Sequence, residues 1–337
     1  MPNAYISGTG LFMPERVVTN DDLAKDYGID TTHEWILQRT GIEQRRFAGE
    51  GVGSSDLAVP AAKQAIERAG LAPGDIDMIV YCTLSPEHCF PGGGVYFQAK
   101  MGMEGVPALD VRNQCSGFLY GLATATSMIR AGAYKNILVI GTEVHSAGLD
   151  LSTRGRTVAC LFGDGAGAAV VSATDDDRGI KWWNLGADGR HADALTCKLW
   201  DVRKRPYIPF DDEGVGHIPL DRMWPYMDGK TVFKNAVEKM ITSVVGMCWE
   251  NKLEVADIDL FFFHQANLRI NQFVMEQLKI PEEKAPSNIQ RYGNTTAATI
   301  PTLLAEAEAS GRLQPGMKVA MVAFGSGFTW GSTYAIW

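Results

Sequence analysis

The stretch Gly70-Leu-Ala-Pro-Gly-Asp-Ile-Asp-Met-Ile-Val-Tyr81 decides the fold, because a second version of it occurs late in the chain. The counterpart is Lys252-Leu-Glu-Val-Ala-Asp-Ile-Asp-Leu-Phe-Phe-Phe263, again after a helical segment. A second pair of segments, 131–141 and 310–325, has a helix that ends at a glycine before a strand begins. Two such pairs in the same order predict that the chain consists of two duplicated α/β halves.

Apolar runs rich in β-branched residues alternate with helical patterns, which is typical of an α/β fold. The expected strands, buried on both faces, are 76–82, 136–141, 166–172, 259–263 and 318–324. The expected helices are 55–69 and the segment after Cys115, where apolar residues recur at helical spacing. We divide the chain into an N-terminal half at 1–175, a connecting segment at 176–230 and a C-terminal half at 231–337.

The composition is that of a globular protein, with 46% hydrophobic and 21% charged residues among 337. A net charge of −8 argues against nucleic acid as a partner. No apolar run approaches the roughly 18 residues that cross a bilayer, and the N-terminus lacks the features of a signal peptide, so we expect a cytoplasmic protein with no membrane contact. The six cysteines include no Cys-x-x-Cys pair, so we expect neither disulfides nor a metal site.

Residues 186–230 combine runs of opposite charge with several aromatic side chains. The aromatics are Trp200, Tyr207, Phe210, Trp224 and Tyr226. Charge runs are usually solvated loops, but this much aromatic surface has to be covered by something. We expect a cap over a pocket or a contact in a dimer.

Cys115 lies in Asp110-Val-Arg-Asn-Gln-Cys-Ser-Gly-Phe-Leu-Tyr-Gly121, where a strand gives way to a helix. The positive end of the helix dipole and the unpaired N–H groups of the first turn favour a thiolate, which is the nucleophilic form of cysteine. Buried cysteines are more often inert, so this stretch alone leaves a nucleophile and a packed core thiol both open.

Two residues of the second half favour the nucleophile. His264 follows a buried strand, at the end where α/β sheets collect ligands, and Asn294 lies in a Gly-Asn turn before a helix. Alone, His264 would be interpreted as a core histidine and Asn294 as an ordinary turn residue. Together with Cys115 they suit decarboxylative carbon–carbon bond formation, in which the thiolate carries an acyl group and two neutral donors stabilise an enolate. A cysteine protease uses the same residue types with the histidine as base.

At these residues the sequence closely resembles β-ketoacyl-acyl-carrier-protein synthase III, of the thiolase superfamily, over nearly the whole chain. The motifs, in order, are Glu34-Trp-Ile36, Arg39-Thr-Gly-Ile-Glu-Gln-Arg-Arg46, the Cys115 stretch, Gly163-Asp-Gly-Ala-Gly-Ala168, Val232-Phe-Lys234, His264-Gln-Ala-Asn-Leu-Arg269, Gly293-Asn-Thr295 and Phe324-Gly-Ser-Gly-Phe-Thr-Trp-Gly331. The resemblance implies a thiolase-like α/β fold, with two stacked βαβαβαββ halves in a five-layered αβαβα core, and a homodimer. It also implies that the glycines at 163–167 form a turn between strands.

The resemblance implies that an acyl-CoA primer acylates Cys115. Malonyl-acyl carrier protein (malonyl-ACP) or malonyl-CoA then loses CO2 with help from His264 and Asn294 and attacks the acyl group. The backbone N–H groups of Cys115 and Ser326 form the oxyanion hole. The substrates are thioesters of coenzyme A and of the phosphopantetheine of acyl carrier protein, and no other cofactor is implied.

The resemblance also assigns binding residues. Trp35, Arg39 and Arg154 match positions that hold the nucleotide end of coenzyme A, and Asn267 matches the pantetheine channel. Lys234 and Arg269 match the basic mouth where acyl carrier protein docks. The acyl pocket is assigned Phe90, which reaches across the dimer interface, Gln114 and Phe324.

Three departures bear on the substrate. Gln114 replaces the small residue that usually precedes the cysteine, the 186–230 segment is long, and Glu276 stands where a lysine is frequent. The alternative function is a starter-unit or acyltransferase homologue that passes the acyl group from Cys115 to another acceptor without decarboxylation. A degradative thiolase fits less well, because it needs a second cysteine late in the chain and the last one is Cys248.

Overall fold

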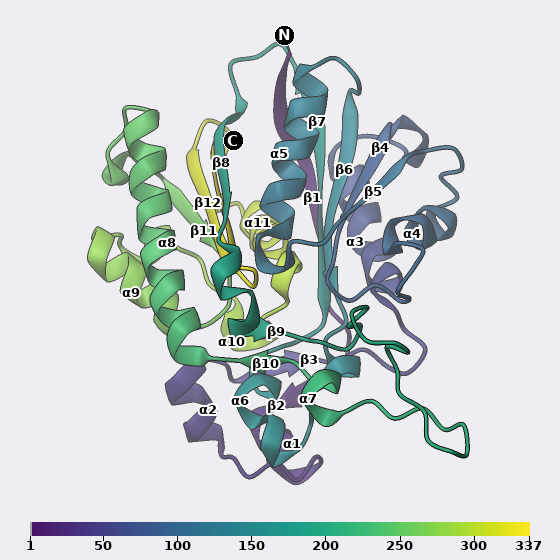
Figure 1. Cartoon of the computed structure of the whole chain (residues 1–337). Helices are drawn as coiled ribbons and strands as arrows, with labels where there is room; N and C mark the ends of the chain where they lie inside the picture. Colours follow the sequence, from purple (N-terminus) through teal and green to yellow (C-terminus); the bar gives the residue numbers. More distant parts are fainter. Residues whose placement is uncertain (1) are drawn as a thin grey trace.

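A computed structural model describes residues 2–337 and has two stacked β-sheets with helices outside and between them (Figure 1). The first sheet has the order β1-β7-β6-β4-β5. Its strands are β1 (Asn3–Phe12), β4 (Met78–Cys82), β5 (Ala108–Val111), β6 (Asn136–Glu143) and β7 (Gly165–Thr174). The pairs β4–β5 and β4–β6 are parallel, whereas β7 is antiparallel to both β6 and β1.

The second sheet has the order β11-β12-β13-β8. Its strands are β8 (Gly179–Ala187), β11 (Leu260–Phe263), β12 (Lys318–Gly325) and β13 (Thr329–Ile336). All four residues of β11 are buried, since helices cover both faces of this sheet. Each of the three consecutive phenylalanines Phe261, Phe262 and Phe263 contributes about 2 kcal/mol by burial.

The helices form three layers around the two sheets (Figure 1). The outer layers are α3 (Ser54–Arg68) with α4 (Gly93–Met101) on the first sheet, and α8 (Gly229–Glu250) with α9 (Leu268–Leu278) on the second. The middle layer, between the sheets, is α5 (Gly117–Arg130) with α11 (Thr299–Ala309). One apolar cluster joins α5 and α11 to both sheets. This arrangement confirms the predicted five-layered αβαβα core.

The two sheets have the same topology, and this places the start of the second half at β8, earlier than the predicted residue 231. The order β8-β13-β12-β11 matches β1-β7-β6-β4, so β8 is the counterpart of β1. The segment predicted as a connection at 176–230 is therefore too long, because residues 179–187 pair with β13 as an edge strand of the second sheet. The true insertion, 188–228, lies between the first strand and the first helix of its half.

Both halves carry such an insertion, and the two lie near each other below the sheets in Figure 1. The first contains β2 (Val17–Thr19), α1 (Asn20–Lys25), α2 (His33–Thr40) and β3 (Gln44–Arg46). The second contains β9 (Leu195–Thr196), α7 (Leu220–Met223) and β10 (Tyr226–Met227). Two further short helices are α6 (Arg156–Ala159) and α10 (Ile289–Tyr292). An apolar cluster packs α1, α2 and α6 together.

The glycines at 163–167 form no turn between strands, because Gly165 and Gly167 lie within β7. A Cβ atom on Gly167 would lie 2.8 Å from the side chain of Pro301 and from the backbone nitrogen of Thr302. The glycine thus lets α11 lie close against the first sheet.

Within the described residues, none of the helices combines the length and the apolar character needed to cross a membrane. In residues 2–337 no three histidine, cysteine or acidic side chains lie close enough together to bind a metal ion.

Candidate active site

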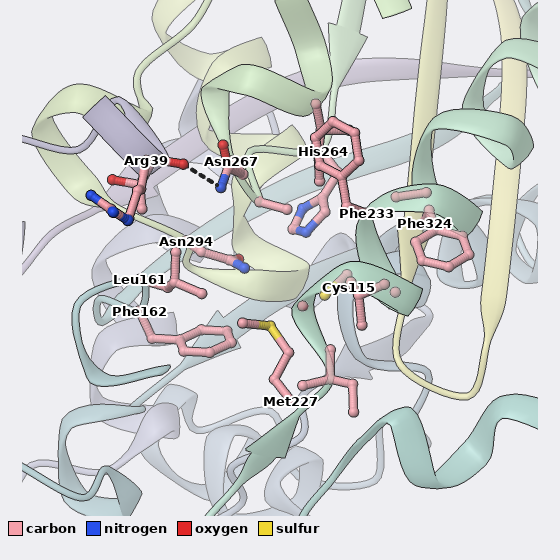
Figure 2. Close-up of a pocket in the computed structure, with 18 of the residues that line it drawn as sticks. Arg39, Cys115, Leu161, Phe162, Met227, Phe233, His264, Asn267, Asn294 and Phe324 are labelled. Atoms are coloured by element: carbon pink, nitrogen blue, oxygen red, sulfur yellow. Dashed lines mark hydrogen bonds between the residues drawn. The ribbon is translucent and has the colours of Figure 1, made fainter. Parts of the chain in front are cut away.

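A cavity of about 280 Å³ lies where the two halves meet, and it brings together Cys115, His264 and Asn294 (Figure 2). Each comes from a different junction: Cys115 precedes α5, His264 follows β11, and Asn294 precedes α11. The rest of the lining is mostly apolar and includes Leu161, Phe162, Leu195, Met227, Phe233, Met240 and Phe324. Leu195 and Met227 come from the 188–228 insertion, so part of that segment does cover the pocket.

Cys115 lies in a 3-10 turn, η2 (Gln114–Ser116), directly before α5. The turn is tight: Gln114 has φ +43°, in the left-handed region, where a residue other than glycine is strained. A Cβ atom on Gly325 would lie 2.6 Å from the Cβ atom of Cys115. The absence of a side chain at Gly325 is what lets the end of β12 pass beside the cysteine.

The surroundings of Cys115 favour the neutral thiol over the thiolate. Burial raises the pKa of its thiol to about 12, and the buried carboxylate of Glu143 acts in the same direction. The backbone N–H groups of Ser326 and Cys115 lower this pKa, but by less than burial raises it. The N–H groups at the helix start thus favour the thiolate, as the sequence predicts, but burial acts more strongly in the opposite direction, so a proton acceptor would assist acylation.

The backbone N–H groups of Ser326 and Cys115 both lower the pKa of the Cys115 thiol, as nearby hydrogen-bond donors do. Ser326 is held in place by its hydroxyl, which donates to the carbonyl of Leu195. These are the two groups that the sequence assigns to an oxyanion hole.

His264 is 1% exposed, and its two ring nitrogens have different surroundings. Nδ1 lies 2.7 Å from the hydroxyl oxygen of Thr299, at the start of α11. Nε2 is buried and has no hydrogen-bond partner in the part of the chain that the structure describes. Burial lowers the pKa of His264 to about 3, so the imidazole is neutral near pH 7.

Asn294 is oriented by its own backbone neighbourhood. Its Oδ1 atom accepts a hydrogen bond of 2.8 Å from the backbone N–H of Thr296. Thr296 has φ +50°, and this unusual conformation aims its N–H at the asparagine. With Oδ1 occupied, the NH2 group of Asn294 is the part left to donate into the cavity that this residue lines.

At the other end of the cavity, Trp35 carries two guanidinium groups. The Cζ atom of Arg39 lies 4.4 Å from the Trp35 ring centroid, and that of Arg156 lies 4.7 Å from it. Arg154, which the sequence pointed to, instead forms an ion pair of 2.6 Å with Asp150. Sequence reasoning missed Arg156, although it lies only two residues along the same turn.

Asn267 lines the cavity and ties α2 to α9. Its side-chain NH2 donates to the carbonyl of Arg39 at 3.0 Å, as Figure 2 shows, and its Oδ1 accepts from the N–H of Arg269. The side chains of Lys234 and Arg269 are exposed, on α8 and α9.

The three acyl-pocket candidates lie in different places. Within residues 2–337 the cavity lining includes Phe324 but neither Phe90 nor Gln114. Phe90 is 84% exposed on the loop before α4. Gln114 shapes the site through its backbone conformation, and its side chain is half-buried.

Two sequence models of the family described as 3-oxoacyl-[acyl-carrier-protein] synthase III match the chain, one at residues 109–189 and its C-terminal counterpart at 248–337. The chain is 40% identical to a β-ketoacyl-[acyl-carrier-protein] synthase III of Clostridium perfringens, over 98% of each chain. The chain belongs to the β-ketoacyl-acyl-carrier-protein synthase III family. It is a condensing enzyme with the thiolase-like fold, and the alternative of acyl transfer without decarboxylation is not favoured.

Solved structures of this family superimpose on the whole chain. The 3-oxoacyl-[acyl-carrier-protein] synthase III of Aquifex aeolicus has a TM-score of 0.88 at 37% identity. The match covers 99% of this chain and 100% of the Aquifex aeolicus chain. The β-ketoacyl-[acyl-carrier-protein] synthase III of Thermus thermophilus has a TM-score of 0.88 at 38% identity, with 99% of each chain covered. Both agree with the fold derived from the duplicated sheets.

Proposed function

We propose that this enzyme transfers an acyl group from acyl-CoA to Cys115 and condenses it with malonyl-ACP or malonyl-CoA, giving a β-ketoacyl thioester, CoA and CO2. The observation that carries the proposal is the convergence of Cys115, His264 and Asn294 on one buried, mostly apolar cavity. A dry cavity strengthens hydrogen bonds to a developing oxyanion and keeps water from the acyl-enzyme.

Cys115 acts as nucleophile in the first half-reaction, and the N–H groups of Cys115 and Ser326 hold the acyl oxygen. In the second, CO2 leaves the malonyl group, and the enolate oxygen lies against the Asn294 amide and His264. The orientation of Asn294, with its NH2 group free, supports this role. Each step uses protein groups and the thioesters themselves, so we propose no resident cofactor.

For the nucleotide end of coenzyme A we propose Trp35, Arg39 and Arg156. Two guanidinium groups over one indole leave a planar, positively charged platform, which suits an adenine ring and its phosphates. Arg154, which the resemblance assigns to this site, stays part of the proposal, because its ion pair with Asp150 leaves the side chain 55% exposed. Asn267 flanks the pantetheine channel between this platform and Cys115.

Lys234 and Arg269 form the mouth for acyl carrier protein in this proposal. Both are exposed cations on neighbouring helices, α8 and α9, beside residues that line the cavity. The overall charge of −8 makes a local basic mouth the feature that an acidic partner would recognise.

We propose a homodimer in which Phe90 of one protomer enters the acyl pocket of the other. Its 84% exposure supports this, because a contact with a second protomer would remove the apolar ring from water. Gln114 and Phe324 would then border the same pocket. The cytoplasmic location of the protein stays a prediction. Sedimentation of the wild type and of Phe90→Ala tests the dimer.

The function is tested by incubating the enzyme with a panel of acyl-CoA thioesters and measuring the intact protein mass. One acyl adduct is expected on the wild type and none on Cys115→Ala. Absence of an adduct with every thioester would overturn the proposal. Peptide mapping assigns the adduct, since Cys89 and Cys197 are also exposed thiols.

A further inference from the structure

Thr299 connects the catalytic histidine to the backbone of the Asn294 turn. Its side chain is 1% exposed, and its hydroxyl oxygen lies 2.7 Å from Nδ1 of His264 and 3.0 Å from the carbonyl oxygen of Thr296. The Thr296 carbonyl has two lone pairs, and it accepts from both the N–H and the hydroxyl of Thr299.

The hydroxyl of Thr299 has only one hydrogen to serve these two neighbours. If it donates to the Thr296 carbonyl, Nδ1–H of His264 donates to it and both contacts are hydrogen bonds. If it donates to Nδ1, two oxygens face each other at 3.0 Å with no hydrogen between them. The first arrangement makes one hydrogen bond more, in a site where an unmade bond is costly.

We infer that Thr299 is a positioning residue that holds the hydrogen of His264 on Nδ1, so that the neutral imidazole presents an unprotonated Nε2 to the cavity. Among residues 2–337, Nε2 has no hydrogen-bond partner, so the contact of Nδ1 with Thr299 is the one that decides between the two tautomers. His264 is then a proton acceptor in the free enzyme, whereas the sequence predicts a donor. The inference rests on the proposed function only for its kinetic consequences.

In this tautomer, Nε2 of His264 can accept the proton of the Cys115 thiol during acylation. The Cys115 proton passes to Nε2 of His264 as the sulfur attacks the acyl carbonyl carbon. The bond from that carbon to the CoA sulfur breaks, and the leaving thiolate takes the proton from Nε2 and departs as CoA. His264 returns to the neutral form with Nδ1–H still on Thr299. The raised pKa of the Cys115 thiol favours a mechanism with such an acceptor.

Condensation consumes one proton, and the same nitrogen receives it. The malonyl C–C bond breaks, CO2 leaves, and the enolate carbon attacks the acyl carbon on Cys115. The sulfur leaves as a thiolate that must be protonated. In this account the proton comes from solvent and binds Nε2 of His264 only as the negative charge of the malonyl group and its enolate arrives. The imidazolium donates to the enolate oxygen and then passes the proton to the sulfur.

The most direct test reads the tautomer itself. In protein labelled with 15N-histidine, the six histidines give separate imidazole signals, and those of His264 are identified by their loss in His264→Gln. We expect a protonated Nδ1 and an unprotonated Nε2 in the wild type near neutral pH. The reverse pattern would overturn the inference, whether or not the protein turns over.

Kinetics provide the second test, with three variants. Thr299→Val keeps the shape and loses the hydroxyl, Thr299→Ser restores it, and Thr302→Val removes a buried hydroxyl one turn along that bonds only backbone and Asn288. Thr299→Val is expected to mix the tautomers and slow single-turnover acylation by about tenfold or more. Thr299→Ser and Thr302→Val are expected to stay within about threefold of wild type.

Unchanged acylation and an unchanged His264 spectrum in Thr299→Val would contradict the inference. Failure of the wild type to acylate would instead contradict the proposed function, and the tautomer spectrum would still decide the role of Thr299. Loss of folding in Thr299→Val is detected by comparing its thermal unfolding with that of Thr302→Val, and the spectrum of the wild type then carries the test alone.

Discussion

The Oδ1 atom of Asn294 accepts a hydrogen bond of 2.8 Å from the backbone N–H of Thr296, which leaves the NH2 group of Asn294 to face the cavity. Asn294→Asp keeps the accepting oxygen and replaces the donor by a second acceptor. We expect acylation of Cys115 to persist and decarboxylation of the malonyl thioester to fall by about 10²–10³-fold. Release of CO2 from pre-acylated enzyme measures this, and an undiminished rate would exclude the enolate role of Asn294.

The stacking on Trp35 predicts which arginine holds coenzyme A more strongly. Loss of one guanidinium from an aromatic face costs about 1 kcal/mol, so Arg156→Ala is expected to raise KM for acyl-CoA by about fivefold. Arg154→Ala removes a half-exposed side chain that is paired with Asp150, and KM should rise less. Initial rates over a range of acyl-CoA concentrations separate the two, and a larger effect at Arg154 would reverse the order.

Gly325 predicts a strict steric requirement beside the nucleophile. A Cβ atom there would lie 2.6 Å from Cβ and 3.1 Å from Sγ of Cys115, so Gly325→Ala must displace the cysteine. Single-turnover acylation should fall by about 10²-fold, since a displacement of about 1 Å costs that much. Gly246→Ala, on a face of α8 with nothing within 4 Å, is the matched control and should keep full activity. Equal rates in the two variants would show that the cysteine has room to move.

Buried His145 predicts a loss of stability in acid. Burial lowers its pKa from 6.5 to about 3, so the unfolded chain binds the proton first as the pH falls. The contribution of His145 to the free energy of unfolding is complete above pH 6.5 and shrinks by about 2 kcal/mol between pH 7 and pH 5. Glu143, with a pKa raised to about 7, acts in the opposite direction, so a difference between variants is needed.

His145→Gln removes the titrating group and retains a donor for Thr296, whose hydroxyl lies 2.6 Å from His145 Nε2. Urea unfolding at pH 7 and pH 5 is expected to show about 2 kcal/mol less acid destabilisation in His145→Gln than in the wild type. The same acid response in both proteins would mean that His145 is protonated in the folded state.

The duplicated halves could be predicted because strands buried on both faces are continuous apolar runs, which are visible in the sequence. Runs such as 259–263 are apolar at every position, and the fold buries them on both faces. The sequence places the edge strand β8 in the connecting segment because an edge strand is not buried on both faces and so lacks a continuous apolar run. Its residues 181–186 are only partly buried, so their pattern is mixed and no echo of β1 is visible.

The three residues that meet in the cavity, Cys115, His264 and Asn294, could be named from residue types at strand and helix ends, but their protonation states could not. The pKa of the Cys115 thiol depends on burial, which the helix-dipole argument does not include. The resemblance singles out Arg154, whereas the contact of the Arg156 guanidinium with the Trp35 ring could not be predicted from the sequence. In the sequence, Thr299 is one of several hydroxyl residues near a helix start. Its proposed positioning role follows from its contact with Nδ1 of His264, which only the structure shows.

The central claim is that the acyl group on Cys115 is joined to a decarboxylated malonyl unit. The measurement is to isolate the acyl-enzyme, add malonyl-ACP, and quantify CO2, β-ketoacyl thioester and residual adduct in one turnover. The account predicts one CO2 and one β-ketoacyl thioester for each acyl group lost from Cys115, and neither product with Cys115→Ala. Loss of the acyl group from the wild type without CO2 or a β-ketoacyl product would contradict it.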